Sequence, residues 1–248
     1  MKILLVGDSC YDEYHFGRVN RISPEAPIPV FDFVRKDIKY GMASNVYENL
    51  KKLGADVHIV TAFLETKKRF IDERSGQQLL RVDEKNARTL DVETADDIFK
   101  LDLDSYDAIV VSDYDKGFLT YSAIEMLRKE YSGPIFIDTK KTDLKAFEGC
   151  FVKINETEFL KAKTKNKDLI VTYGGQKVTW NGLGFYPPKV EAYDVCGAGD
   201  TFLAALAYKY IETENDMKAA IEFAMKAAGV TVQKIGVYAP TLLEINND

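Results

Sequence analysis

Four short apolar runs of one kind recur along the chain, at residues 3–6, 108–111, 135–137 and 169–171. Each run is continuous and rich in Ile, Leu and Val, which is typical of strands that are buried on both faces of a parallel sheet. Elsewhere apolar residues recur at helical spacing, and the four helices that this spacing predicts lie near residues 43–50, 121–131, 203–211 and 220–228. Alternating strands and helices predict an α/β fold with a mainly parallel central sheet.

Two further segments have a different pattern. Residues 11–40 hold three of the seven prolines, and the run VFDFV at 30–34 alternates between apolar and polar positions. Residues 70–83 indicate a hairpin with its turn near Ser75-Gly76. We therefore expect residues 11–40 and 69–83, approximately, to form a small antiparallel sheet, a lid, beside the main one. The chain shows no internal repeat or linker, so we expect a single domain over residues 1–248.

Composition and charge exclude several classes of function. The chain has 248 residues, 46% of them hydrophobic, and a formal net charge of -6, so no basic face indicates a nucleic-acid partner. The three cysteines show no CxxC spacing, which favours neither a disulfide framework nor a zinc site. The apolar run in the opening MKILLVGDS is too short for a signal peptide or a membrane span. We expect a cytoplasmic protein without a membrane partner.

Polar residues follow each of the four buried runs, where the predicted strands end. They are Gly7-Asp8, Ser112-Asp113, Asp138-Thr139-Lys140 and the stretch 172–175. In open parallel sheets, ligands bind in the crevice beyond the carboxyl ends of the strands. Polar loops and helix caps would explain any one of these strand ends. Four such ends favour a shared site.

The segment DVCGAGD at 194–200 stands just before a predicted helix. Gly197, Ala198 and Gly199 have almost no side chain, so a ligand could approach the backbone closely. The first amides of a helix lack intrahelical partners and favour an anion, such as a phosphoryl group in transfer. Asp200 could then take a proton from a substrate hydroxyl, although an aspartate in a first turn also complements the helix dipole. The Walker pattern GxxxxGK[ST] is absent.

The segment NETE at 155–158 also has two interpretations. Asn155 with Glu158 three residues later is a good capping box for a helix. The same amide and carboxylate could lie near a hydrated Mg²⁺, which keeps several of its waters in proteins. The spacing favours the cap and leaves the metal interpretation open.

DVCGAGDTF resembles the signature of the ribokinase-like (PfkB) carbohydrate kinases. Other segments resemble one branch of that family, the kinase domain that makes heptose 1,7-bisphosphate in the bacterial ADP-heptose pathway. They are GDSCYDEY, RISPEAPIPV, SGQQLLRVD, VVSDYDKG, FIDTKKTD and YDVCGAGDT, and they follow the family order from residue 3 to about 236. RISPEAP is specific to the branch, whereas GAGD is specific only to the superfamily. The resemblance implies a three-layer α/β fold with a β lid and a kinase that uses ATP and Mg²⁺. The implied acceptor is the anomeric hydroxyl of D-glycero-D-manno-heptose 7-phosphate.

The resemblance also implies roles for individual residues. Asp200 would be the general base, with the anion hole at Gly197, Ala198 and Gly199. The residues implied to hold the sugar are Asp8, Asp12, Gly41 and Asn45. Those implied on the nucleotide side are Lys140, Asn155, Thr172, Gly175 and Cys196, with Asn155 and Glu158 near Mg²⁺ through water and Asp194 near a monovalent cation such as K⁺. A phosphorylated acceptor needs cations, for which we single out Arg21 and Lys116. Members of the family often dimerise through the lid, so a homodimer is a further expectation.

The chain departs from the family pattern at particular places. Met42 replaces a glycine of the sugar loop, Cys196 replaces a threonine, and Met225 stands where many members have an asparagine near the adenine. Two stretches are shortened, one between residues 61 and 67 and one between 160 and 168. These departures leave two alternatives: a kinase for another sugar or nucleoside, and a catalytically weak nucleotide- or sugar-binding protein on the same fold.

Overall fold

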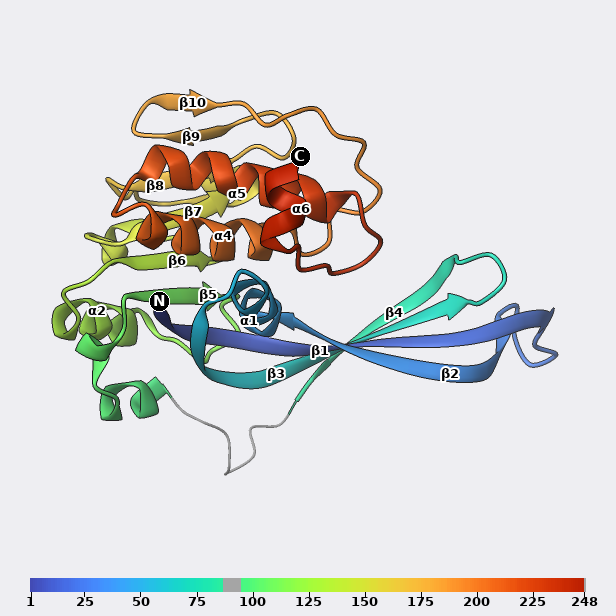
Figure 1. Ribbon diagram of the computed structural model, residues 1–248. Coiled ribbons are helices and arrows are strands. Elements are labelled where there is room, and N and C mark those ends of the chain that lie inside the picture. Colours follow the sequence, from blue (N-terminus) through green and yellow to red (C-terminus); the bar gives the residue numbers. More distant parts are fainter. Residues whose placement is uncertain (87–94, 248) are drawn as a thin grey trace.

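The computed structural model describes residues 1–86 and 95–247. Among them a ten-stranded sheet has the order β10-β9-β8-β7-β6-β5-β1-β3-β4, with β2 paired to β1 (Figure 1). The strands are β1 (Lys2–Ile22), β2 (Pro29–Met42), β3 (Asp56–Asp72), β4 (Gln78–Lys85), β5 (Ala108–Asp113), β6 (Ile135–Thr139), β7 (Phe151–Asn155), β8 (Leu169–Thr172), β9 (Val178–Trp180) and β10 (Leu183–Phe185).

The central part of this sheet is parallel, as the apolar runs predict. Strands β3, β1, β5, β6, β7 and β8 pair in parallel, and the four predicted runs lie in β1, β5, β6 and β8. The prediction of a mainly parallel α/β fold is confirmed. Strand β7 and the inner part of β3 were not predicted, because polar residues such as Lys153 and His58 interrupt their apolar runs.

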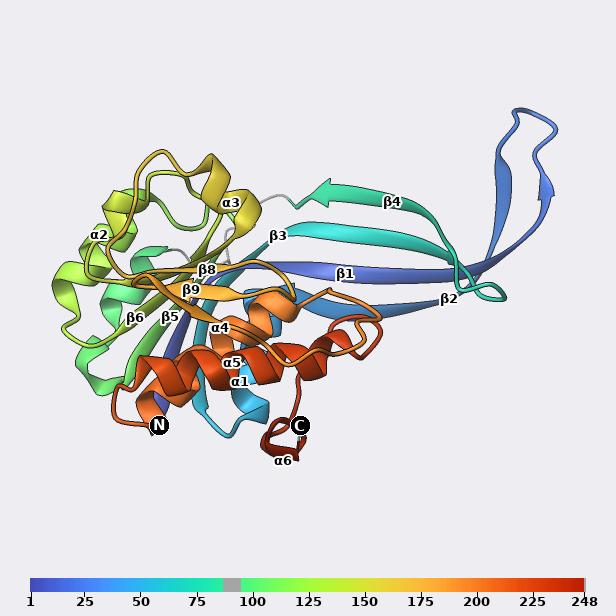
Figure 2. The same ribbon diagram turned by 90° about the horizontal axis from the view of Figure 1, so that it is seen from above.

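Helices cover both faces of the sheet and give three layers (Figure 2). One face carries α1 (Ala43–Lys52), α4 (Ala198–Glu212) and α5 (Met217–Val232), whose buried side chains share one core cluster. The other carries α2 (Tyr121–Glu130), α3 (Glu156–Lys161) and the 3₁₀ turns η1 (Ala95–Lys100), η2 (Leu103–Ser105) and η3 (Leu144–Phe147). The short α6 (Leu242–Asn247) follows α5. None of the described helices has the length and apolar character needed to cross a membrane.

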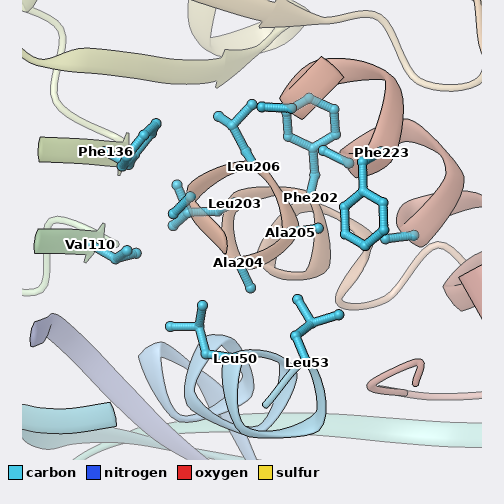
Figure 3. Packing of buried hydrophobic residues seen from close by; sticks show 14 of the residues in the cluster. Leu50, Leu53, Val110, Phe136, Phe202, Leu203, Ala204, Ala205, Leu206 and Phe223 are labelled. Carbon is cyan, nitrogen blue, oxygen red and sulfur yellow. The ribbon is translucent and has the colours of Figure 1, made fainter. Parts of the chain in front are cut away.

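Helix α4 lies at the centre of the first layer. Its residues from Asp200 to Ala207 are all buried, because it packs against the sheet, α1 and α5 together. Figure 3 shows Leu203 and Leu206 of α4 beside Val110 and Phe136 of the sheet, with α1 and α5 on its other sides. Close packing on several sides fixes the position of the first turn of α4.

Strands β1 and β3 continue past the main sheet and project from it together with β2 and β4 (Figures 1 and 2). We call β2, β4, residues 9–22 of β1 and residues 63–72 of β3 the extension. The segments 11–40 and 69–83, predicted as a lid, lie in it, and β3 and β4 form the predicted hairpin. Its outward part is antiparallel at the β1–β2 and β3–β4 pairs but parallel between β1 and β3.

Candidate active site

The site is built on the first turn of α4, which begins at Ala198. Gly197, directly before it, has a φ of 79°, a left-handed conformation that favours glycine. A Cβ at Gly197 would also lie 2.7 Å from Nδ2 of Asn45. The amides of Gly199 and Asp200 have no hydrogen-bond partner within residues 1–86 and 95–247, whereas the Ala198 amide donates to a carbonyl of the preceding loop at 3.3 Å. The free donors at this helix start are suited to an anion.

Asp200 is buried in this turn and is 5% exposed. Its Oδ2 accepts a hydrogen bond from Nδ2 of Asn45, and its Oδ1 accepts one from the Tyr114 hydroxyl, each at 2.9 Å. Burial raises the pKa of Asp200 to about 6, and the nearby Asp138 carboxylate adds to this rise. The two hydrogen bonds and the charge of Lys153 act in the opposite direction. A carboxylate with a pKa near neutrality is suited to accept a proton from a hydroxyl.

A buried ion pair lies beside the same turn. Nζ of Lys153 in β7 is 2.7 Å from Oδ2 of Asp138 in β6, and the two residues are 4% and 5% exposed. A Cβ at Gly199 would lie 3.0 Å from this Nζ, so the ammonium group reaches the backbone where the amides are free. The sequence pattern marked Asp138 only as a polar strand end and did not indicate Lys153. The available signal was a lysine inside a buried strand, since lysine is rarely buried without a paired charge.

A mostly apolar cavity of about 440 Å³ opens next to this turn. Its walls are the start of α4, Lys153, the end of β8 with the following turn, the loop 187–195 and one face of α5. The predicted nucleotide residues Thr172 and Gly175 line it, and so does Met225. This volume lies within the usual range for small-molecule sites. The structure thus brings the predicted nucleotide edge and the free amides to one cavity.

Asn155 and Glu158 form the predicted capping box at the start of α3. Oδ1 of Asn155 accepts from the Glu158 amide at 2.9 Å, and Oε2 of Glu158 accepts from the Asn155 amide at 2.8 Å. The second oxygen of Glu158 pairs with Lys140. No group of three or more His, Cys, Asp or Glu residues in the described part of the chain could hold a metal ion. The Glu158 carboxylate and the Asn155 side-chain amide are too few to coordinate a metal ion fully, but they fit a Mg²⁺ that keeps most of its water ligands.

Asp194 joins the loop before α4 to the loop after α5. Its Oδ1 accepts from the Cys196 amide at 2.9 Å, and its Oδ2 accepts from the Gly236 amide at 2.8 Å. Both carboxylate oxygens of Asp194 therefore accept backbone amides. The role of Asp194 near a monovalent cation stays a prediction. Cys196 is half-buried, and burial raises the pKa of its thiol.

Predicted acceptor residues gather where β1 leaves the main sheet. Asn45 lies in the first turn of α1, beside Asp200. Gly41 of β2 is opposite Cys10 of β1, and a Cβ at Gly41 would lie 2.8 Å from Sγ of Cys10. The Asp12 carboxylate pairs with Arg69 of β3, a cation that the sequence pattern did not single out. These residues form the side of the site that faces the extension.

Asp8 has a different setting. It is 1% exposed, and its carboxylate accepts three backbone amides, from Tyr114 at 2.8 Å, Lys116 at 3.3 Å and Phe118 at 3.4 Å. Burial raises the pKa of Asp8, and these hydrogen bonds oppose the rise. Asp8 therefore holds the turn 114–118 that follows β5.

The two cations predicted for an acceptor phosphate lie far apart. Lys116, in the turn after β5, pairs with Glu65 of β3 at 2.6 Å. Arg21 is exposed near the outer end of β1, about 30 Å beyond Asp12 at the rise of an extended strand. One chain by itself brings Lys116, but not Arg21, close to the predicted acceptor residue Asp8.

Comparison with known proteins adds to this geometry. Residues 147–244 match the family described as pfkB family carbohydrate kinase. The chain is 32% identical to the bifunctional protein HldE of a Nitratiruptor species, over 98% of the chain and 64% of that relative. It is 31% identical to the bifunctional protein HldE of Campylobacter jejuni, over 99% of the chain and 64% of the relative. The chain is thus similar to PfkB carbohydrate kinases over residues 147–244 and to HldE proteins along nearly its whole length.

The chain is shorter than these relatives. It spans about 64% of the length of the two HldE proteins, and its alignment with the Nitratiruptor protein runs over 297 positions, more than its own 248 residues. The relatives therefore carry additional internal residues, as predicted. At the predicted places, β3 continues unbroken to Asp72, and α3 is only six residues long.

Solved structures with the same fold confirm the ribokinase-like architecture. A ribokinase from Thermotoga maritima matches with a TM-score of 0.69 and 16% identity, over 99% of this chain and 98% of that one. The phosphofructokinase-2 from Escherichia coli in complex with potassium matches with a TM-score of 0.74 and 16% identity, over 99% and 96%. At such identities the likeness concerns the fold alone.

Proposed function

We propose that this chain is a PfkB carbohydrate kinase that transfers the γ-phosphoryl group of ATP to a sugar hydroxyl, with Asp200 as the general base. The observation that carries the proposal is the position of Asp200. Its neighbours Ala198 and Gly199 line the apolar cavity. Its own carboxylate accepts a hydrogen bond from Asn45, on the proposed acceptor side. A base at the boundary of two sites can meet a hydroxyl from one side while a phosphoryl group arrives from the other.

In the proposed reaction the sugar oxygen bonds to the γ-phosphorus as the bond from that phosphorus to the bridging oxygen of ADP breaks. The hydroxyl proton passes to the Asp200 carboxylate. The free amides of Gly199 and Asp200 and the ammonium group of Lys153 lie where negative charge would develop, and such fixed donors need no reorganisation during the reaction. A Mg²⁺ near Glu158 and Asn155, held through water, would screen the charge of the phosphates.

For the acceptor we propose the anomeric hydroxyl of D-glycero-D-manno-heptose 7-phosphate. The similarity to HldE proteins over nearly the whole chain supports this choice. The test is ADP release with ATP, Mg²⁺ and a panel of acceptors: heptose 7-phosphate, unphosphorylated heptose, ribose, fructose 6-phosphate and a nucleoside. Phosphorus NMR would show the new phosphate on the anomeric carbon. We expect turnover with heptose 7-phosphate to exceed that with every other acceptor.

Met42 supports the second candidate, a kinase for a different acceptor. It precedes α1 with a φ of 61°, a conformation that favours glycine, and its side chain is 3% exposed. A buried methionine at this place fills space between β2 and the first turn of α1 that a glycine would leave free. Turnover with ribose or a nucleoside, and none with heptose 7-phosphate, would favour this candidate. Nucleotide binding without turnover on any acceptor would favour a binding protein.

Lys116 lies in the same turn as Tyr114, which contacts Asp200, whereas Arg21 lies near the outer end of β1. We expect Lys116→Ala to raise the KM for a phosphorylated acceptor about tenfold, because a charge-assisted hydrogen bond is lost. The KM for the unphosphorylated sugar should not change. Steady-state kinetics with both sugars checks this, with Lys129→Ala on the exposed side of α2 as the control. An unchanged KM for the phosphorylated sugar would place the phosphate elsewhere.

We also propose that two chains associate through the extension. Its strands expose large apolar side chains, among them Phe33 at 60%, Ile38 at 49% and Leu80 at 55%. Exposed large apolar residues on edge strands favour an interface. We expect the double variant Phe33→Asp/Ile38→Asp to be monomeric by light scattering and the parent chain to be dimeric. Leu243→Asp, on exposed α6, is the control and should stay dimeric.

A further inference from the structure

Tyr114 contacts the base directly, although no motif assigns it a role. It lies in the turn after β5, and its hydroxyl donates to Oδ1 of Asp200 at 2.9 Å. Asn45 donates to Oδ2 at the same distance. Each oxygen of the carboxylate therefore has one protein donor and keeps a further lone pair for a substrate hydroxyl.

The carboxylate of Asp8 holds the backbone of Tyr114. Oδ2 of this buried carboxylate accepts the Tyr114 amide at 2.8 Å, and the next two hydrogen bonds of Asp8 hold the following residues of the turn. The ring of Tyr114 is held as well. Nζ of Lys140 lies 5.1 Å from its centroid, and Nζ of Lys67 lies 6.0 Å from it. Attraction between the ammonium groups and the ring limits its movement.

We propose that Tyr114 is the positioning residue of the base: it orients the Asp200 carboxylate, and Asp8 acts on the reaction through Tyr114. The chain of contacts is short. Asp8 holds the Tyr114 amide, and the Tyr114 hydroxyl holds Oδ1 of Asp200. This inference rests on the proposed role of Asp200, and it gives Asp8 a different role from the sugar contact that the family resemblance implies.

The hydrogen bond from Tyr114 also affects the protonation of the base. It lowers the pKa of Asp200, so its removal raises that pKa. The other groups that face Asp200 are Asn45 of α1, Asp138 of β6, Lys140 after β6, Lys153 of β7 and Cys196 before α4. All of these stay in place in Tyr114→Phe. Burial raises the pKa of Tyr114 itself well above its usual range, so the hydroxyl remains a donor.

The first test is the pH profile of Tyr114→Phe. We expect the acidic limb of kcat/KM to move up by about one pH unit, the amount that follows from losing one hydrogen bond to a charged group. The KM for ATP should stay the same. The matched control is Tyr131→Phe, because the Tyr131 hydroxyl is also buried and donates one hydrogen bond, to the Tyr106 carbonyl at 2.9 Å, away from the site. An acidic limb that does not move overturns the proposal, whether or not the KM for the acceptor rises.

A second measurement separates this inference from the proposed function. Carbon NMR of ¹³C-labelled aspartate carboxyls gives the pKa of Asp200 without any turnover, and Asp200→Asn assigns the signal. We expect that pKa to rise in Tyr114→Phe and in Asp8→Asn. If the parent chain transfers no phosphoryl group, the proposed function fails, and this titration still decides the role of Tyr114. A pKa of Asp200 unchanged in both variants overturns the inference even in an active kinase.

Discussion

Replacing Asp200 with asparagine is expected to lower kcat by at least about 10²-fold, because a positioned general base contributes about 10²–10⁴ in rate. Asparagine keeps the size of the side chain but cannot accept the hydroxyl proton. The affinity for ATP should change little, since the carboxylate faces the acceptor side. Steady-state kinetics with the best acceptor of the panel, together with calorimetric titration of an ATP analogue, measures both quantities. Turnover near that of the parent chain would remove Asp200 from its assigned role.

Two controls distinguish lost chemistry from lost folding in Asp200→Asn. Asp216 caps α5, and asparagine is an equally good cap, so Asp216→Asn should keep full activity. The second control is stability. The folded-state pKa of Asp200, about 6, lies above the usual value for aspartate, so the stability contributed by its protonated form is lost as the pH rises through 6. At pH 7 to 8 the variant should therefore unfold at the same temperature as the parent chain or at a higher one.

Replacing Lys153 with methionine is expected to lower the free energy of unfolding by about 3–5 kcal/mol at neutral pH. The variant leaves the Asp138 carboxylate buried without its partner, and Oδ1 of Asp138 already has no hydrogen-bond partner among the described residues. Urea unfolding, followed by the fluorescence of the single tryptophan, Trp180, measures the change. Activity should fall as well, because Lys153 lines the cavity beside the free amides.

The double variant Lys153→Met/Asp138→Asn tests the cause of this loss. Removing both charges should restore more than half of the stability but not the activity. Lys100→Met is the surface control: its pair with Asp97 is exposed, and such pairs contribute about 0–1 kcal/mol. If Lys153→Met costs no more than Lys100→Met, the buried pair does not stabilise the fold as we infer.

Most of the sheet could be predicted because continuous apolar runs have few interpretations. The runs in β1, β5, β6 and β8 are short and bounded by polar residues, and each became a buried parallel strand. Strand β7 could not be predicted in this way. Lys153 breaks its apolar run, and only its partner on the neighbouring strand makes a buried lysine acceptable.

The candidate site, too, could be predicted only in part. The motif at 194–200 placed Asp200 at a helix start, and the resemblance to a family gave it a role. Two donors to Asp200 come from far along the chain: Asn45 is 155 residues away and Tyr114 is 86. The motif gave no indication that the carboxylate of Asp8 holds the turn 114–118, because the amides that it accepts come from more than 100 residues away.

The sequence by itself determined the parallel α/β core, the helix start at Gly197-Ala198 and the family resemblance, because these depend on local pattern and on motifs in order. Only the tertiary structure decided which distant side chains surround Asp200, where the cavity opens, and that Arg21 lies at the outer end of the extension whereas Lys116 lies in the turn after β5. The physical reason is that burial, hydrogen bonding and charge pairing join residues across strands and layers. Burial raises the pKa of Asp200 to about 6 against the opposing effect of its two hydrogen bonds and Lys153, a balance that no spacing along the chain could reveal.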